Sequence, residues 1–292
     1  MALDDLISRV RRPAIAALAA LTLLPAPACD ARHPRLHSSH GTRSRTAATH
    51  SGRSFAELGP PAVGYKSTVP DHNFRGVDLA DRNLAIGRIQ RTERWRNIIE
   101  TVEDRYGIPR NTIYAVIMQE SYGDPIQPNA SGDGGLGLIH FQPGTARAYG
   151  LNIVGNSHAS GRDSRHGRQL RELLSECNYN LPCVLREDDR AHPVIIVDAI
   201  ARYLKDGFAR KGNWWGAVGT INPGQGSYAR RISRWQGMIE KNRGAAAQDF
   251  NQRNSGKKDG TGHGMTFDHY IGTFLETNER NYGLGEYRRM RR

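Results

Sequence analysis

One carboxyl group in this sequence stands where a folding chain normally places an apolar side chain. Glu120 ends the segment NTIYAVIMQE, in which Ile113, Val116, Ile117 and Glu120 recur at the spacing of one helix face. A carboxyl group among apolar side chains is poorly hydrated and holds its proton to higher pH, and the negative end of its own helix acts in the same direction. Glu120 is therefore a candidate general acid. The alternative is a helix that frays after Met118 and leaves Glu120 in water.

A loop rich in Gly, Pro and Asn follows Glu120 and leads into another helix start. It reads SYGDPIQPNASGDGGLGLIHFQPGTARAYGL. Such a loop lowers stability unless backbone must approach another group closely. Asp133 in this loop is a candidate second carboxylate, although an Asp followed by Gly is also a common turn pair.

Five short motifs, in this order, resemble the lytic transglycosylases of the soluble transglycosylase (SLT) type. They are Glu120-Ser121, Ala130-Ser131, Gly137-Leu138-Ile139-His140, Pro143-Gly144-Thr145-Ala146 and Ile221-Asn222-Pro223-Gly224. The resemblance covers roughly residues 106–232. It implies a mainly α, lysozyme-like helical domain with long Gly-rich loops, and it implies that Glu120 is the catalytic acid.

The resemblance also implies which residues contact the glycan. Ser131 matches a loop serine beside the cleaved bond, and Asn222 matches a position that helps to hold the sugar. His140 stands where the family usually has Gln and can still donate a hydrogen bond, whereas Ile221 replaces a Tyr and can only pack. The full implied set of substrate-binding residues is Ser121, Ser131, Gly137, His140, Gln142 and Asn222.

The reaction implied by the resemblance is cleavage of the β-1,4 bond between N-acetylmuramic acid and N-acetylglucosamine in peptidoglycan. One carboxyl group acts first as acid and then as base to the 6-hydroxyl, which gives a 1,6-anhydro sugar. Ordinary glycoside hydrolases need a second carboxylate. Goose-type lysozymes have an Asp in the loop where Asp133 lies, so a muramidase is the nearest enzymatic alternative. The changes at His140 and Ile221 suggest a further alternative, which is a catalytically impaired peptidoglycan-binding protein of the same fold. No cofactor and no metal are expected.

Residues 1–28 have the pattern of an export signal. A basic segment precedes an apolar run from Pro13 to Leu24, and small residues end at Ala28. The apolar run is short for a membrane span. Cys29 follows at the position that carries lipid in bacterial lipoproteins. We therefore expect a periplasmic protein attached to the membrane through Cys29, with simple signal cleavage as the alternative.

Residues 29–75 are predicted to form a disordered basic tether. No acidic residue occurs from Ala31 to Ala56, and arginines alternate there with His, Ser, Thr and Gly. The net charge of +12 favours a polyanionic partner. The export signal argues against nucleic acid, as does the lack of a basic helix or an aromatic platform. The expected partner is the glycan strand of peptidoglycan, and the expected state is a monomer.

The rest of the chain is predicted to form helices separated by Gly-rich loops. Sequence patterns predict helices over 98–106, 113–120, 143–149, 194–204, 213–221 and 228–239, and glycines at 107, 150 and 207 are predicted to end helices. We assign 76–243 to a lysozyme-like transglycosylase domain, 244–263 to a linker, and 264–292 to a C-terminal helix with a basic tail. The apolar stripe of that helix predicts packing on the domain, and partner or membrane binding is the alternative.

Two cysteines remain once Cys29 is set aside. Cys177 and Cys183 lie in CNYNLPC, and an even pair in an oxidising compartment predicts a disulfide. A zinc site would need a second ligand pair nearby, and two free buried thiols are the other alternative. The neighbouring Asp188, Asp189 and His192 are read as an acidic helix start and not as metal ligands.

Overall fold

The computed structural model describes residues 76–155 and 164–289, and in this part of the chain it contains helices and no strand. This confirms the mainly α prediction. The signal segment, Cys29 and the basic tether lie outside the described residues. The elements are α2 (Ala85–Thr92), η2 (Glu93–Trp95), α3 (Arg96–Tyr106), α4 (Thr112–Glu120), α5 (Pro143–Ala148), α6 (Ser164–Glu176), α7 (Leu181–Val184), η3 (Asp189–Ala191), α8 (Pro193–Lys211), α9 (Trp214–Gly219), α10 (Tyr228–Arg253), α11 (Phe267–Asn281) and α12 (Leu284–Arg289).

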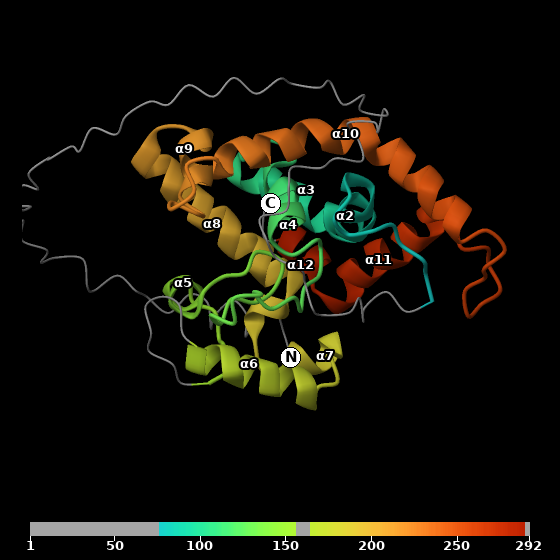
Figure 1. Ribbon diagram of the computed structural model, residues 1–292, viewed down its shortest axis with the longest axis horizontal. Helices are drawn as coiled ribbons and strands as arrows, with labels where there is room; N and C mark the ends of the chain where they lie inside the picture. Colours follow the sequence, from blue (N-terminus) through green and yellow to red (C-terminus); the bar gives the residue numbers. More distant parts are fainter. Residues whose placement is uncertain (1–75, 156–163, 290–292) are drawn as a thin grey trace, which may run out of the picture.

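The helix that carries Glu120 is the centre of the fold. Every side chain of α4 from Ile113 to Met118 is at most 1% exposed, as expected for a helix that is apolar on all sides. It packs against α2, α3, α8 and α10, and Figure 1 shows it among these helices. Core packing on several sides therefore fixes the direction in which its last residue points.

A buried carboxyl group of α3 caps the start of α4. Gly107 ends α3 with a φ of 65°, which is the left-handed conformation common at helix ends. After the turn, Glu103 accepts hydrogen bonds from the backbone N–H groups of Asn111 and Ile113, at 2.9 and 2.7 Å. Glu103 therefore satisfies two of the N–H groups that a helix start leaves without partners.

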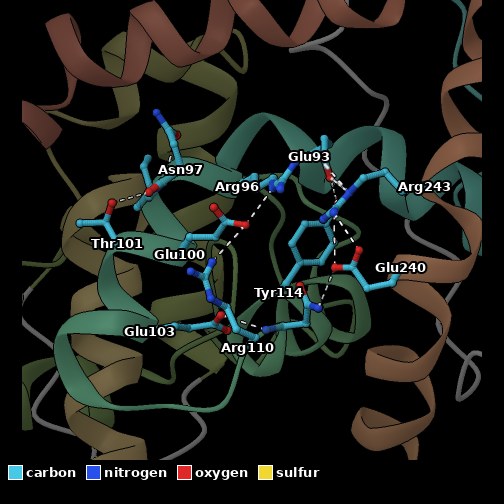
Figure 2. A network of polar contacts seen from close by, with 12 residues as sticks. Glu93, Arg96, Asn97, Glu100, Thr101, Glu103, Arg110, Tyr114, Glu240 and Arg243 are labelled. Atoms are coloured by element: carbon cyan, nitrogen blue, oxygen red, sulfur yellow. Dashed lines mark hydrogen bonds and ion pairs between the residues drawn. The ribbon is translucent and has the colours of Figure 1, made fainter.

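A hydrogen bond and ion pairs through Glu93 connect α4 to its neighbouring helices. The hydroxyl of Tyr114 donates to Glu93 Oε2 at 2.8 Å, and Arg243 Nε lies 3.2 Å from Glu93 Oε1. Figure 2 shows these contacts of Glu93, together with its ion pair to Arg96 of the following helix. Because Glu93 is 3% exposed, removing a single partner would leave a buried charge with too few contacts, which is costly. The network holds α4 to η2, α3 and α10.

One predicted helix end and one predicted linker boundary are wrong. Helix α8 continues through Gly207 to Lys211. A Cβ at Gly207 would lie 3.1 Å from the Cα of Ala217 in α9, so glycine allows the two helices to cross closely here. Helix α10 continues through Gly244 to Arg253, so the first half of the predicted linker 244–263 is helical. Ala246 and Phe250 in this extension are fully buried. Burial of these apolar side chains therefore stabilises α10 beyond Gly244.

The C-terminal helices pack back on the domain. Phe267 and Tyr270 of α11 form a small apolar cluster with Phe250 of α10. The hydroxyl of Tyr287 in α12 donates to Asp198 of α8 at 2.9 Å. The described helices include none with the length and apolar character needed to cross a bilayer.

Helices α6 and α7 form a second, smaller core on one edge of the molecule. Leu170 and Leu174 of α6 pack there with Ile126 and Leu136 from the loop that follows Glu120. The predicted disulfide between Cys177 and Cys183 is present, with an S–S distance of 2.06 Å. In Figure 1 the loop after α4 lies between α6 and the larger helical core. This loop therefore has packed helices on two sides.

Candidate active site

A cavity of about 420 Å³ opens at the end of α4, where Glu120 lies. Its size falls in the range of about 300–1,000 Å³ that is common for ligand sites. It is lined by Arg88 and Gln119, by Glu120 and Tyr122, by loop residues within 127–133 and 139–145, by Tyr203, by residues 221–225, and by Tyr228 and Arg231. The cavity therefore brings together segments from both halves of the folded chain.

Glu120 combines burial with a small number of polar contacts. Its side chain is 20% exposed, and its Oε1 accepts a 2.6 Å hydrogen bond from the hydroxyl of Tyr228. Oε2 lies 3.8 Å from Nδ1 of His140. Glu120 belongs to the last turn of α4, so the alternative of a frayed, fully solvated end is wrong.

Burial raises the pKa of Glu120 from 4.5 to about 7. The hydrogen bond from Tyr228 and the charges of Arg231 and Arg88 act in the opposite direction and lower it. A carboxyl group that titrates near neutral pH can donate a proton and accept one with little penalty in either state. The arrangement suits a single group used as acid and as base.

Sequence reasoning missed Tyr228 as a site residue. It reads as one apolar position of the helix stripe that continues with Ile232, Trp235 and Ile239. Its ring is 1% exposed and belongs to the core, whereas its hydroxyl reaches the cavity and bonds Glu120. One signal was available in the sequence: Ile221 stands where the family has a Tyr, and Tyr228 at the start of the next helix could supply the missing hydroxyl.

His140 lies close to Glu120 without forming a short hydrogen bond to it. Its φ of 47° is unusual for a residue with a side chain, and such conformations cluster at functional sites. Burial lowers the pKa of His140 to about 4. The imidazole is therefore neutral at neutral pH and adds no positive charge beside Glu120.

Asp133 lines the same cavity, but its oxygens are engaged in the loop. They accept hydrogen bonds from the side-chain amide of Asn129 at 3.1 Å and from the backbone N–H of Gly135 at 3.2 Å. The carboxyl group is 6% exposed. These contacts match the turn role that an Asp before glycine often has.

The predicted substrate-binding residues divide into two groups. Gln142 and Asn222 line the cavity together with His140, and Oε1 of Gln142 is buried and has no hydrogen-bond partner among the described residues. Ser121 and Ser131 are not among the lining residues. Ser121 is fully buried, with its Oγ 3.3 Å from the backbone N–H of Gly123, whereas Ser131 is exposed on the loop.

Gly137 also lies outside the cavity lining, and packing explains its type. Its φ is 86°, and a Cβ there would lie 2.1 Å from the carbonyl oxygen of Arg190. Gly137 therefore lies where two backbone segments approach closely, and its contact with the glycan stays a prediction. A residue with a side chain would displace the loop.

A buried arginine that sequence reasoning did not select holds this loop. Arg190 is fully buried, pairs with Asp188 at 2.7 Å, and donates to the carbonyl oxygens of Gly134 and Phe141 at 2.6 and 3.1 Å. These carbonyl groups belong to loop segments on both sides of His140. No group of three or more His, Cys, Asp or Glu residues in the described chain has a geometry that could hold a metal.

The comparison with family models gives one match. Residues 97–167 match the model of the transglycosylase SLT domain. Searches of the curated proteins and of the solved structures found no match. The matched segment runs from α3 through Glu120 and the loop to α6, whereas Arg190, Asn222 and Tyr228 lie beyond it. Residues 97–167 are therefore similar to the transglycosylase SLT domain.

Proposed function

We propose that the protein is a peptidoglycan lytic transglycosylase. It cleaves the β-1,4 bond between N-acetylmuramic acid and N-acetylglucosamine and leaves a 1,6-anhydro end. The observation that carries this proposal is the carboxyl group of Glu120 in a cavity of about 420 Å³, with a pKa raised to about 7 by burial. The match of residues 97–167 to the transglycosylase SLT domain supports the substrate class.

The reaction uses Glu120 twice. In its protonated form, Glu120 donates to the glycosidic oxygen as the bond to C1 of N-acetylmuramic acid breaks. The resulting carboxylate then accepts the proton of the 6-hydroxyl while that oxygen bonds to C1. Because Tyr228 donates to Oε1, we assign the transferred proton to Oε2.

Polar side chains around the cavity have the chemistry to hold the glycan. Gln142 offers a carbonyl oxygen that no group in the described part of the chain hydrogen-bonds, which suits an amide or hydroxyl group of a sugar. Asn222 lines the same cavity, as does Arg231. Arg231 donates to the side chains of Ser227 and Gln225, and its charge stabilises the carboxylate form of Glu120.

A muramidase is the second candidate, and one observation favours it. Among the described residues that line the cavity, Asp133 is the other carboxyl group besides Glu120. A hydrolase would use such a group to activate water or to attack the sugar. The hydrogen bonds from Asn129 and Gly135 instead support a turn role for Asp133.

Mass spectrometry of digested cell-wall sacculi distinguishes the candidates. The transglycosylase gives muropeptides with 1,6-anhydro ends, and the hydrolase gives reducing ends that take up oxygen from isotope-labelled water. A binding protein leaves the glycan intact. Asp133→Asn should keep most of the activity of a transglycosylase, and an inactive but folded Asp133→Asn protein would favour the hydrolase.

We further propose export to the periplasm and lipid attachment at Cys29. Family proteins act on peptidoglycan, which lies outside the cytoplasmic membrane, and Cys29 follows the predicted signal segment. A multiply acylated N-terminus resists extraction by salt, whereas a charged tether is screened over about 10 Å at 0.1 M salt. Wild-type protein that leaves membranes in concentrated salt, with an unmodified Cys29, would contradict lipidation. Cys29→Ser should release the protein or stall its processing.

A further inference from the structure

A second hollow lies beside the cavity that contains Glu120. It has a volume of about 100 Å³ and lies between the loop after α4 and helix α6. Residues 127–130 line both the hollow and the cavity, so the two spaces share one wall. A volume of about 100 Å³ equals that of roughly three water molecules. The hollow therefore has room for a small chemical group such as a carboxylate.

Two glycines bring α6 against the loop at this place. A Cβ on Gly167 of α6 would lie 1.9 Å from the carbonyl oxygen of Gly132, so the helix touches the loop backbone directly. One turn further along α6, Nη1 of Arg171 lies 3.0 Å from the point where Gly132 would carry a Cβ. Arg171 therefore extends over the loop at the edge of the hollow.

Arg171 is a cation without a counter-charge in the described part of the chain. Its side chain is exposed, and it forms no ion pair or hydrogen bond with another described residue. The hollow itself is lined by Gln127, Pro128, Asn129, Ala130, Gly132, Gly134, Gly135, Gly167, Leu170 and Arg171. No carboxyl group occurs among these lining residues, and Arg171 is the charged side chain among them.

We propose that this hollow binds a carboxylate carried by an N-acetylmuramic acid unit, with Arg171 as its counter-charge. The proposal rests on the proposed function, which places the glycan strand in the adjoining cavity. Each N-acetylmuramic acid bears a lactyl group that ends in a carboxylate or continues into a peptide stem with carboxylates of its own. A guanidinium group pairs well with a carboxylate, because two parallel N–H groups can donate to its two oxygens.

The subsite gives this enzyme a preference for glycan strands whose units carry a carboxylate. A unit whose substituent carries a carboxylate gains a contact that a plain N-acetylglucosamine unit lacks. Since Arg171 is exposed, water and salt weaken the interaction. The preference should therefore be clear at low ionic strength and should fall as salt is added.

Binding to a protein that does not cut its ligand tests the proposal. Glu120→Gln protein is titrated with three fragments of equal length: glycan with peptide stems, glycan without stems but with free lactyl carboxylates, and chito-oligosaccharide with neither. Arg171→Gln is added to this background, and Arg168→Gln is the matched control. Arg168 is an exposed arginine of the same helix that does not line the hollow.

We expect Arg171→Gln to weaken binding of carboxylate-bearing fragments by about threefold to tenfold at low salt. The chito-oligosaccharide should bind equally to both proteins, and Arg168→Gln should change each Kd by less than about twofold. An effect confined to stem-bearing glycan identifies a stem carboxylate, and an equal effect on stem-free glycan identifies the lactyl group.

Several results would overturn the proposal. Equal losses for all three fragments, or equal losses in Arg168→Gln and Arg171→Gln, would mean that no carboxylate occupies the hollow. If the fragments bind but Arg171→Gln changes nothing, the subsite fails while the proposed function stands. If no fragment binds to either protein, the proposed function fails as well.

Discussion

Replacing Tyr228 with Phe tests how the protein sets the acidity of Glu120. The substitution keeps the buried ring, which is 1% exposed, and removes the hydroxyl that donates to Glu120 Oε1 at 2.6 Å. That hydrogen bond favours the carboxylate form and lowers the pKa of Glu120, whereas burial raises this pKa to about 7. Without the hydroxyl, burial is opposed only by the charges of Arg231 and Arg88.

The expected change follows from the strength of the lost bond. A hydrogen bond to a charged group contributes about 1.5–3 kcal/mol, and one pKa unit corresponds to about 1.4 kcal/mol. These figures give a rise of roughly one to two units. The Glu120 side chain is 20% exposed, so water replaces part of the lost contact. We expect the pKa of Glu120 to rise by about one unit.

The pH profile of glycan cleavage reports this pKa. The first step needs protonated Glu120, so the rate falls as the pH rises through its pKa. In Tyr228→Phe this fall should move about one unit to higher pH. Tyr203→Phe is the control, because Tyr203 lines the same cavity but donates to the carbonyl oxygen of Thr220. An alkaline limb that stays in place, or moves to lower pH, would refute the reasoning.

Three further predictions concern stability, measured by urea unfolding. Because burial raises the pKa of Glu120 from 4.5 to about 7, the stability from its protonated form is complete below about pH 4.5 and lost as the pH rises through 7. Glu120→Gln should therefore raise the free energy of unfolding at pH 8 by up to about 3 kcal/mol, and hardly change it at pH 4. Gly137→Ala should lower it by more than about 2 kcal/mol, because the new Cβ would meet the Arg190 carbonyl oxygen. Reducing the disulfide between Cys177 and Cys183 should lower it by about 2 kcal/mol, and intact stability would show that packing alone holds α6 and α7.

The central helix could be predicted from the sequence because its signals are local. The apolar spacing of Ile113, Val116 and Ile117 predicted a helix that ends at Glu120, and α4 spans Thr112–Glu120, although it is buried on all sides and not along one stripe alone. Gly107 was likewise read as a helix end, and it adopts the left-handed conformation there. Patterns within one or two turns were sufficient for these features.

Other features depend on contacts between distant segments. The hydrogen bond between Tyr228 and Glu120 joins residues 108 positions apart, so helical spacing gave no sign of it. Gly207 was predicted to end a helix and Gly244 to begin a linker, but α8 and α10 continue through them. A glycine in a helix can mark close packing, as at Gly207, as well as a helix end. The apolar stripe alone could not distinguish a glycine that ends a helix from one that allows close packing within it.

The turnover of Glu120→Gln on purified sacculi tests the central claim most directly. The amide keeps the shape of the side chain and can still accept the hydrogen bond from Tyr228, but it cannot donate and recover a proton. We predict that release of muropeptides falls by about a thousandfold or more, while circular dichroism shows an intact helical fold. A folded Glu120→Gln protein that releases muropeptides at close to the wild-type rate would contradict the account.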